Sequence, residues 1–128
     1  MTGLIVAGHN GFAKGMLEAG RLLTGDYPHM AEVDFYPHES EETLNQKLQQ
    51  AMDSMEECHK VFVLCDILGG SPFKNAASLW YGNEKVIILY GVNLSILVEL
   101  SMNMIMEQDE LTAEELISIG QKQIGCLQ

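Results

Sequence analysis

Residues 61–72 read VFVLCDILGGSP, with Val61 first and Pro72 last. The first five side chains are apolar and mostly branched, as in a strand that is buried on both faces of a sheet. Asp66 ends this apolar run and two glycines follow it. Ser71 then suits the N-cap of a helix and Pro72 its first helical position. A strand, a short glycine-containing loop and a helix start predict a β-α unit of a parallel sheet.

Three further apolar runs suit the same kind of unit. Residues 4–7 and 86–90 are continuous and predict strands buried on both faces, whereas residues 32–36 alternate with polar residues and predict an edge strand. Helical periodicity predicts helices over residues 12–24, 41–55, 72–81 and 94–106, and a capping box at 112–115 opens a last helix that ends near residue 123. The helix over 94–106 is apolar on nearly all sides, which favours burial, including burial in a subunit interface.

This alternation predicts an α/β fold with an open, mainly parallel sheet and helices on both faces. Right-handed crossovers favour the strand order 2-1-3-4, as in a flavodoxin-like three-layer sandwich. A length of 128 residues suits one domain over residues 1–128.

Composition narrows the classes of function. Hydrophobic residues make up 47% of the chain and charged residues 20%, and no apolar run is long enough for a membrane span. The N-terminus lacks the pattern of a signal peptide, and three cysteines without a CxxC pair suggest no disulfide framework, so we expect a cytoplasmic protein. A net charge of −11 argues against nucleic acid and against an anionic membrane. It either suits a partner with a basic docking patch or serves solubility alone.

One histidine and one aspartate follow strands that this topology makes neighbours. His9 follows the first strand and Asp66 follows the third, and strand order reverses between these two strands. Ligands bind at such a reversal, beyond the carboxyl ends of the strands. A carboxylate beside an imidazole fixes its tautomer, which leaves the other ring nitrogen as a directed nucleophile. If Asp66 holds the δ nitrogen, the ε nitrogen is the reactive one.

The loop after Asp66 predicts a place for an anion. Gly69 and Gly70 let the backbone approach a bound group, the amides of the following helix favour negative charge, and Ser71 adds a hydroxyl donor. Together with His9 this arrangement predicts a phosphoryl group carried on histidine, without a metal or cofactor. We interpret the remaining histidines, whose spacing matches no zinc pattern, as surface residues; they are His29, His38 and His59.

Three other classes compete with this hypothesis. His9, Asp66 and Ser71 are the residue types of a hydrolase triad, but the chain has no Gly-x-Ser-x-Gly elbow. A receiver-like module phosphorylated on Asp66 needs an acidic pair after the first strand to hold magnesium, and that pair is missing. A flavin or nucleotide domain of the same fold is disfavoured because the chain has neither a G-x-G-x-x-G nor a G-x-x-x-x-G-K-[ST] motif.

Three segments resemble the IIA component of the mannose family (mannose/fructose/sorbose/N-acetylgalactosamine type) of the bacterial phosphoenolpyruvate:sugar phosphotransferase system. The resemblance covers essentially the whole chain, and Asp-x-x-Gly-Gly-Ser-Pro is its most specific motif. The segments are Ile5-Val6-Ala7-Gly8-His9-Asn10-Gly11-Phe12-Ala13-Lys14-Gly15, then Cys65-Asp66-Ile67-Leu68-Gly69-Gly70-Ser71-Pro72-Phe73 continuing through Asn75 and Ala76, and Gly91-Val92-Asn93-Leu94 continuing to Glu99.

The resemblance implies a phosphotransferase that acts through a phosphohistidine. His9 would take phosphate from the phosphorylated carrier protein HPr and pass it to a IIB component, so that the membrane subunits IIC and IID are served indirectly. Asp66 would hold the imidazole and Ser71 would contact the phosphoryl group. The resemblance also implies a homodimer in which a C-terminal segment crosses between subunits.

The resemblance also implies less specific roles for further residues. Asn93 would help to shape the pocket, and Phe12 and Phe73 would either form a docking surface or pack in the core. Asn10 stands where many family members have glycine, and asparagine tolerates the same left-handed backbone better than most residues.

No IIB domain follows the last helix, so we expect IIB to be a separate chain. A related subunit that serves dihydroxyacetone kinase is the alternative within this chemistry, although the Gly-Gly-Ser-Pro and Gly-Val-Asn-Leu segments favour the sugar branch. The transported sugar cannot be inferred from this chain.

Overall fold

A computed structural model describes residues 1–108 and 111–128 of the chain. Strands and helices alternate along the sequence as the apolar pattern predicts, and a fifth helix follows the fourth β-α unit. The elements are β1 (Thr2–His9), α1 (Phe12–Thr24), β2 (Met30–Phe35), α2 (Glu41–Asp53), β3 (Lys60–Cys65), α3 (Ser71–Trp80), β4 (Val86–Leu89), α4 (Leu94–Ile105) and α5 (Ala113–Lys122).

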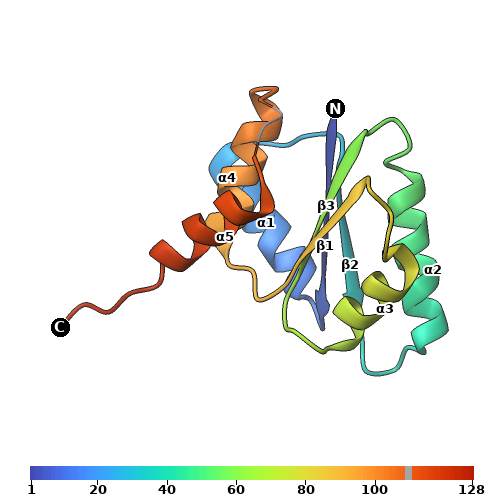
Figure 1. Cartoon of the computed structure of the whole chain (residues 1–128). Coiled ribbons are helices and arrows are strands. Elements are labelled where there is room, and N and C mark those ends of the chain that lie inside the picture. The colour runs from blue at the N-terminus through green and yellow to red at the C-terminus, as the bar shows by residue number, and fades with distance from the viewer. Residues whose placement is uncertain (109–110) are drawn as a thin grey trace.

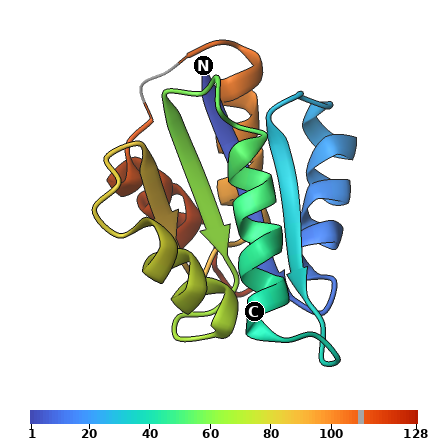
Figure 2. The same cartoon turned by 90° about the vertical axis from the view of Figure 1, so that its right-hand side faces the viewer.

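The four strands form one parallel sheet in the order β2-β1-β3-β4. Helices α2 and α3 cover one face of the sheet, whereas α1 and α4 cover the other and α5 packs on α4 (Figures 1 and 2). The predicted order 2-1-3-4 and the three-layer arrangement are therefore confirmed. No helix among the described residues is both long and apolar enough to cross a lipid bilayer.

The core consists of two apolar layers that share the central strand. Leu4 and Val6 of β1 point into the layer beneath α1 and α4, and Ile5 and Ala7 point into the layer beneath α2 and α3. All four side chains have an exposed fraction of 0%. Burial on both faces explains why this strand reads as a continuous apolar run instead of an alternating one.

The burial predicted for both faces of β4 is wrong, and the burial predicted for α4 holds for one side of that helix. Val86, Ile87 and Ile88 of β4 are only half-buried, because β4 lies at an edge of the sheet where the helices cover its faces incompletely. Helix α4 buries one side against α1, the sheet and α5, but Met102 and Met106 on its other side are exposed. Coverage of this second side by another subunit stays a prediction.

Candidate functional site

His9 and Asp66 meet at the carboxyl edge of the sheet, as the topology predicts. His9 is the last residue of β1 and Asp66 directly follows β3. These two strands pair directly, and the amide of Asp66 donates to the carbonyl of Ala7 at 3.2 Å. One carboxylate oxygen of Asp66, Oδ2, accepts the backbone N–H of His9 at 2.8 Å and lies 2.7 Å from the Nδ1 atom of its ring. The other oxygen accepts the N–H of Ile67 at 2.8 Å. The carboxylate is thus held at both oxygens.

This contact determines which ring nitrogen of His9 is available. A carboxylate can only accept hydrogen bonds, so Nδ1 carries the proton in the contact with Asp66, and in the neutral imidazole the lone pair is then on Nε2. The side chain of His9 is 43% exposed and that of Asp66 is 14% exposed. The arrangement combines a partly buried orienting group with a nucleophilic nitrogen that an incoming group can reach.

The glycine loop lies against the imidazole of His9. A Cβ atom on Gly70 would stand 2.6 Å from Cε1 of His9 and 3.3 Å from its Nε2. Such a distance to Cε1 is shorter than carbon atoms tolerate, so only glycine fits here while the ring keeps its place. Gly69, beside it, has a positive φ of 83°, which glycine adopts without strain.

Helix α3 begins at this loop with an uncapped N-terminus. Its N-cap is Gly70, and Ser71 is the first helical residue, which corrects the prediction that Ser71 is the cap. The cause is the loop geometry, because the extended backbone at Gly70 already supplies the non-helical cap conformation. No side chain caps the helix, and the amides of Ser71 and Phe73 have no acceptor among the described residues. Free amides at a helix start favour an anion beside His9.

The turn between β1 and α1 places His9 from the other side. Asn10 and Gly11 both have a left-handed backbone, with φ values of 50° and 91°, so asparagine does adopt the conformation that glycine favours. The amide of Asn10 donates to the carbonyl of Phe35 at 3.0 Å, which extends the pairing of β1 with β2. A mostly apolar pocket of about 160 Å³ lies here, lined by His9, Asn10, Phe35, Tyr36 and Pro37.

The three remaining residues named from the resemblance have structural contacts. Asn93 is the N-cap of α4, where its Oδ1 accepts the amide of Ile96 at 3.1 Å and its Nδ2 donates to the carbonyl of Gly120 at 2.9 Å. Phe12 is half-buried against the core layer beneath α1. Phe73 is half-buried and packs edge-on against Tyr90, with ring centroids 5.2 Å apart. Their part in a phosphate pocket or docking surface stays a prediction.

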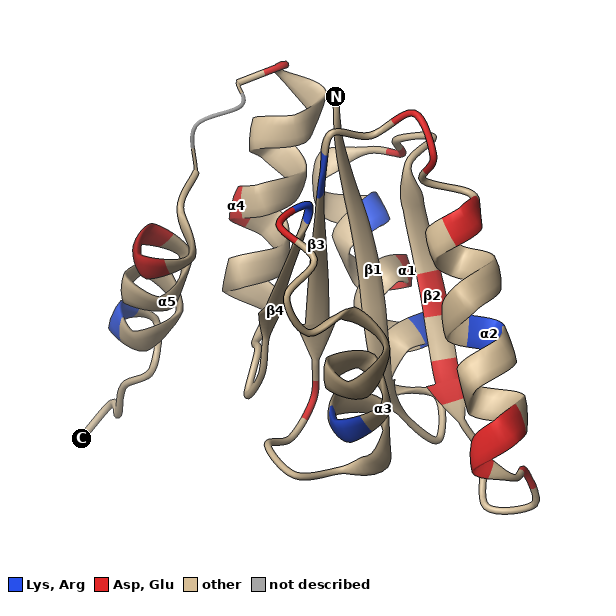
Figure 3. Cartoon of the chain, turned by 45° about the vertical axis from the view of Figure 1, so that its right-hand side comes forward, with Lys and Arg blue, Asp and Glu red and all other residues tan. Residues whose placement is uncertain are grey.

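The other predicted surface histidines lie away from this contact. His38 and His59 are exposed, whereas His29 is half-buried beside the ring of Tyr27. Acidic residues outnumber basic ones by 18 to 7 and are spread over several elements, so the negative charge is not confined to the site (Figure 3).

A comparison with family models identifies the chain. The EIIA-man model, described as the PTS system fructose IIA component, matches residues 3–118. The chain belongs to this family. The match includes His9, Asp66 and the whole glycine loop, and the resemblance noted from the sequence is confirmed at the level of the family.

Individual proteins similar to this chain are components of phosphotransferase systems. The fructose-specific EIIA component of Bacillus subtilis is 34% identical over 99 residues, which are 77% of this chain and 68% of that protein. The mannose-specific EIIAB component of Escherichia coli K12 is 31% identical over 121 residues, which are 94% of this chain but only 36% of that longer protein. A crystal structure of a PTS IIA protein associated with the fucose utilization operon of Streptococcus pneumoniae has a TM-score of 0.88 at 25% identity and covers 98% of this chain and 92% of its own.

Asp34 is a residue of this region that the sequence analysis did not select. It lies in β2, is 6% exposed, and its carboxylate contacts the start of α1. Aspartate is uncommon inside strands, and this was the available signal. The signal stayed weak because the partners of Asp34 are backbone amides, which leave no mark in the sequence.

Proposed function

We propose that this chain is the phosphoryl carrier of a sugar phosphotransferase system and that Nε2 of His9 carries the phosphoryl group. The observation that carries the proposal is the contact between Asp66 and Nδ1 of His9, which leaves Nε2 as a nucleophile at an accessible site. Membership of the EIIA-man family supports the direction of transfer, from phosphorylated HPr to a IIB component.

The transfer needs one bond to form and one to break. Nε2 of His9 attacks the phosphorus atom on the donor, the bond between that phosphorus and the donor breaks, and the donor keeps the electron pair. The imidazole of His9 gains positive charge as the Nε2–P bond forms, and the carboxylate of Asp66 balances that charge while it holds the proton on Nδ1. Transfer to IIB is the reverse of this step with a new acceptor.

The start of α3 supplies the electrostatic part of the site. The free amides of Ser71 and Phe73, with the hydroxyl of Ser71, are donors for the equatorial oxygens of the phosphoryl group. The lack of a Cβ atom at Gly70 leaves space next to Nε2. A hydrolase triad has less support, because the structure gives no hydrogen bond between the hydroxyl of Ser71 and the ring of His9.

A homodimer is part of the same proposal. A largely apolar groove of about 410 Å³ lies between the β4 edge and α5 and includes Ile88, Tyr90 and Ile117. The segment after α5 is exposed and extends away from the body of the molecule (Figure 1). We propose that this segment crosses to a second copy. Static light scattering of the whole chain and of a chain that ends at residue 122 tests this, and monomers in both samples would refute it.

The partners follow from the same assignment. We propose that residues 1–128 act as one IIA domain, that HPr and IIB bind the His9 edge in turn, and that IIC and IID are reached only through IIB. The relatives are named for fructose and mannose, and a related structure is linked to a fucose operon, so the family does not single out a sugar.

The decisive experiment is phosphorylation with labelled phosphoenolpyruvate, Enzyme I and HPr. We expect one acid-labile, base-stable phosphate per chain, which is lost in His9→Ala. His38→Ala removes an exposed histidine from a loop and is the matched control, which we expect to be labelled like the wild type. Acid-stable label, or label that persists in His9→Ala, would refute the assignment.

A further inference from the structure

Asp34 lies in β2, and its carboxylate caps the N-terminus of α1. Its Oδ1 accepts the amide of Ala13 at 2.9 Å and its Oδ2 accepts the amide of Lys14 at 3.0 Å. These are the second and third residues of α1, and the N-cap of that helix, Gly11, has no side chain that could do the same. A buried side chain of β2 therefore accepts hydrogen bonds from two backbone amides at the start of α1.

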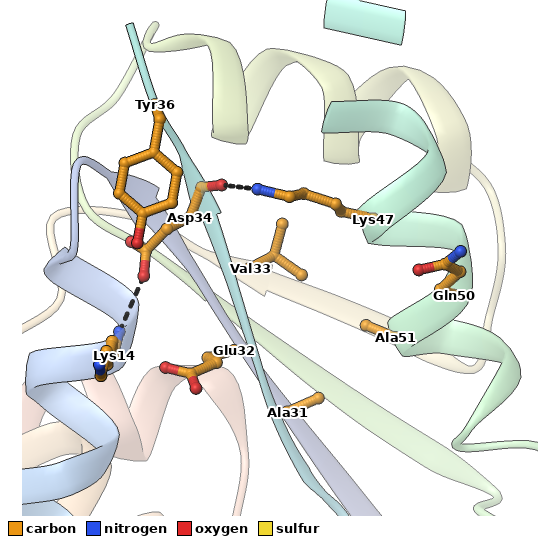
Figure 4. A pocket seen from close by; sticks show the side chains of 9 residues that line it. All are labelled: Lys14, Ala31, Glu32, Val33, Asp34, Tyr36, Lys47, Gln50 and Ala51. Atoms are coloured by element: carbon orange, nitrogen blue, oxygen red, sulfur yellow. Dashed lines mark hydrogen bonds between the residues drawn. The ribbon is translucent and has the colours of Figure 1, made fainter. Parts of the chain in front are cut away.

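The backbone of Asp34 is held on its opposite side. Nζ of Lys47 in α2 donates to the carbonyl of Asp34 at 2.7 Å, and the same ammonium is 2.7 Å from a carboxylate oxygen of Glu39 and 5.1 Å from the ring centroid of Tyr36. Figure 4 shows the hydrogen bonds that join Asp34 to the backbone amide of Lys14 in α1 and to Nζ of Lys47 in α2, among the residues that line a pocket of about 420 Å³. Asp34 is thereby tied to both flanking helices, which limits how far its carboxylate can move.

This cap creates an asymmetry around His9. Two helices begin next to the carboxyl edge, α1 directly after the Asn10–Gly11 turn and α3 directly after Gly70. At the start of α1 the carboxylate of Asp34 accepts the amides of Ala13 and Lys14, whereas at the start of α3 no carboxylate accepts the amides of Ser71 and Phe73 among the described residues. A doubly charged phosphoryl group is repelled by a carboxylate and attracted by free amides.

We propose that Asp34 is a positioning residue for phosphoryl transfer, and that its carboxylate at the start of α1, which accepts the amides of Ala13 and Lys14, directs the phosphoryl group on His9 to the start of α3. The inference rests on the proposed function of His9. Asp34 does not touch the reacting atoms. It acts through the amides of Ala13 and Lys14 and through the turn that follows His9, and β1 and β2 are in register at this point, with Gly8 opposite Asp34.

Amide resonances of the wild-type protein test the asymmetry directly, by two-dimensional ¹H–¹⁵N NMR before and after phosphorylation by HPr. We expect the amide protons of Ser71 and Phe73 to move downfield when they meet the phosphoryl oxygens. The amides of Ala13 and Lys14 should keep their positions because Asp34 already occupies them. Downfield movement at Ala13 or Lys14, or none at Ser71 and Phe73, overturns the proposal.

Asp34→Asn tests the role in transfer, with Glu32→Gln as the matched control. Both changes remove one negative charge from β2, but Glu32 is exposed at the same pocket and caps no helix. In Asp34→Asn an amide group replaces one acceptor at the start of α1. We expect kcat for transfer from phosphorylated HPr to fall by about tenfold to a hundredfold, with KM little changed and with a shifted ³¹P resonance of the phosphohistidine. Glu32→Gln should behave as the wild type.

The outcomes separate this inference from the proposed function. A wild-type chain that HPr does not phosphorylate refutes the function of His9, and the inference falls with it. A wild-type chain that is phosphorylated on His9, beside an Asp34→Asn chain with unchanged kcat and an unchanged ³¹P resonance, overturns only the role of Asp34. Normalising kcat to the fraction of folded molecules, measured by circular dichroism, removes any loss that comes from stability alone.

Discussion

Asp66 holds His9 twice, because a single carboxylate oxygen contacts the ring Nδ1 at 2.7 Å and accepts the backbone N–H of the same residue at 2.8 Å. The ring and the backbone of His9 are thus both held by Oδ2 of Asp66. Any rotation of the imidazole lengthens one contact while the other keeps the backbone in place. The orientation of Nε2 is therefore set by β1, β3 and the side chain that joins them.

Asp66→Asn should slow the acceptance of phosphate from HPr by about a hundredfold while the fold persists. Asparagine matches the shape of aspartate, but it cannot balance the positive charge that develops on the ring. Rapid-quench kinetics would measure the rate, and thermal unfolding would check the fold. Asp53→Asn, an exposed carboxylate at the end of α2, is the control. A rate equal to that of the wild type would remove Asp66 from the mechanism.

Gly70→Ala should impair phosphorylation because the new Cβ atom would clash with the ring of His9. The backbone of Gly70, with φ −72° and ψ 162°, suits alanine, but the new Cβ would stand 2.6 Å from Cε1 of His9 and push the ring out of line. We expect a slower transfer and a changed ring signal of His9 in NMR spectra. Gly15→Ala is the control, since a Cβ there meets nothing within 4 Å, and in mid-helix it should stabilise the protein by about 0.5–1 kcal/mol. Equal transfer rates in both variants would contradict the steric argument.

Asn93→Ala should destabilise the protein without preventing phosphorylation. The carboxamide of Asn93 caps α4 and also donates to the carbonyl of Gly120 in α5, so its loss leaves two backbone groups without their partner. We expect the free energy of unfolding, measured with urea, to fall by about 1–2 kcal/mol. A stable variant that is no longer phosphorylated would instead place Asn93 in the phosphate pocket.

The three cysteines should differ in reactivity. Burial, reinforced by the negative charge of Asp66, raises the pKa of Cys65 to about 12, and burial also raises the pKa of Cys58. Cys126 is exposed. Because the thiolate is the reactive form, a chromogenic disulfide reagent at neutral pH should titrate one thiol rapidly, and all three only after denaturation. Rapid reaction of two or three thiols in the folded protein would contradict this burial pattern.

Glu39 should contribute to stability at neutral pH and lose that contribution in acid. The hydrogen bond from Lys47 has the largest effect and the hydrogen bond from the N–H of Tyr36 the second largest, and both hold the pKa of Glu39 below its ordinary value of 4.5. A carboxyl group with a lowered folded-state pKa stabilises the fold above its unfolded-state pKa, and that contribution disappears as the pH falls through the lower folded value. Glu39→Gln should therefore be less stable than the wild type above pH 4.5, and the difference should shrink below it. Urea unfolding across this range measures it, and a constant difference would contradict the prediction.

Much of this architecture can be inferred from local patterns along the chain. Continuous apolar runs followed by helical periodicity indicate a parallel sheet, and the fixed handedness of crossovers limits the strand order to few choices. Once the order 2-1-3-4 is adopted, His9 and Asp66 must meet at one edge, although they are far apart in sequence. The contact at 2.7 Å confirms that inference about their neighbourhood.

Contacts between elements account for what the sequence did not predict. Ser71 reads as an N-cap, but the extended backbone of Gly70 takes that place. The apolar runs of β4 and α4 do not reveal that the faces of this edge strand are covered incompletely and that one side of the helix is exposed.

Local pattern alone therefore determined the strands, the helices and the edge at which His9 lies. Only the tertiary structure decided that Gly70 must lack a side chain beside His9 and that Asp34 accepts two amides at the start of α1. The physical reason is that periodicity records how each segment faces the core, whereas a contact between a side chain and a distant backbone depends on how the packed elements are placed in space.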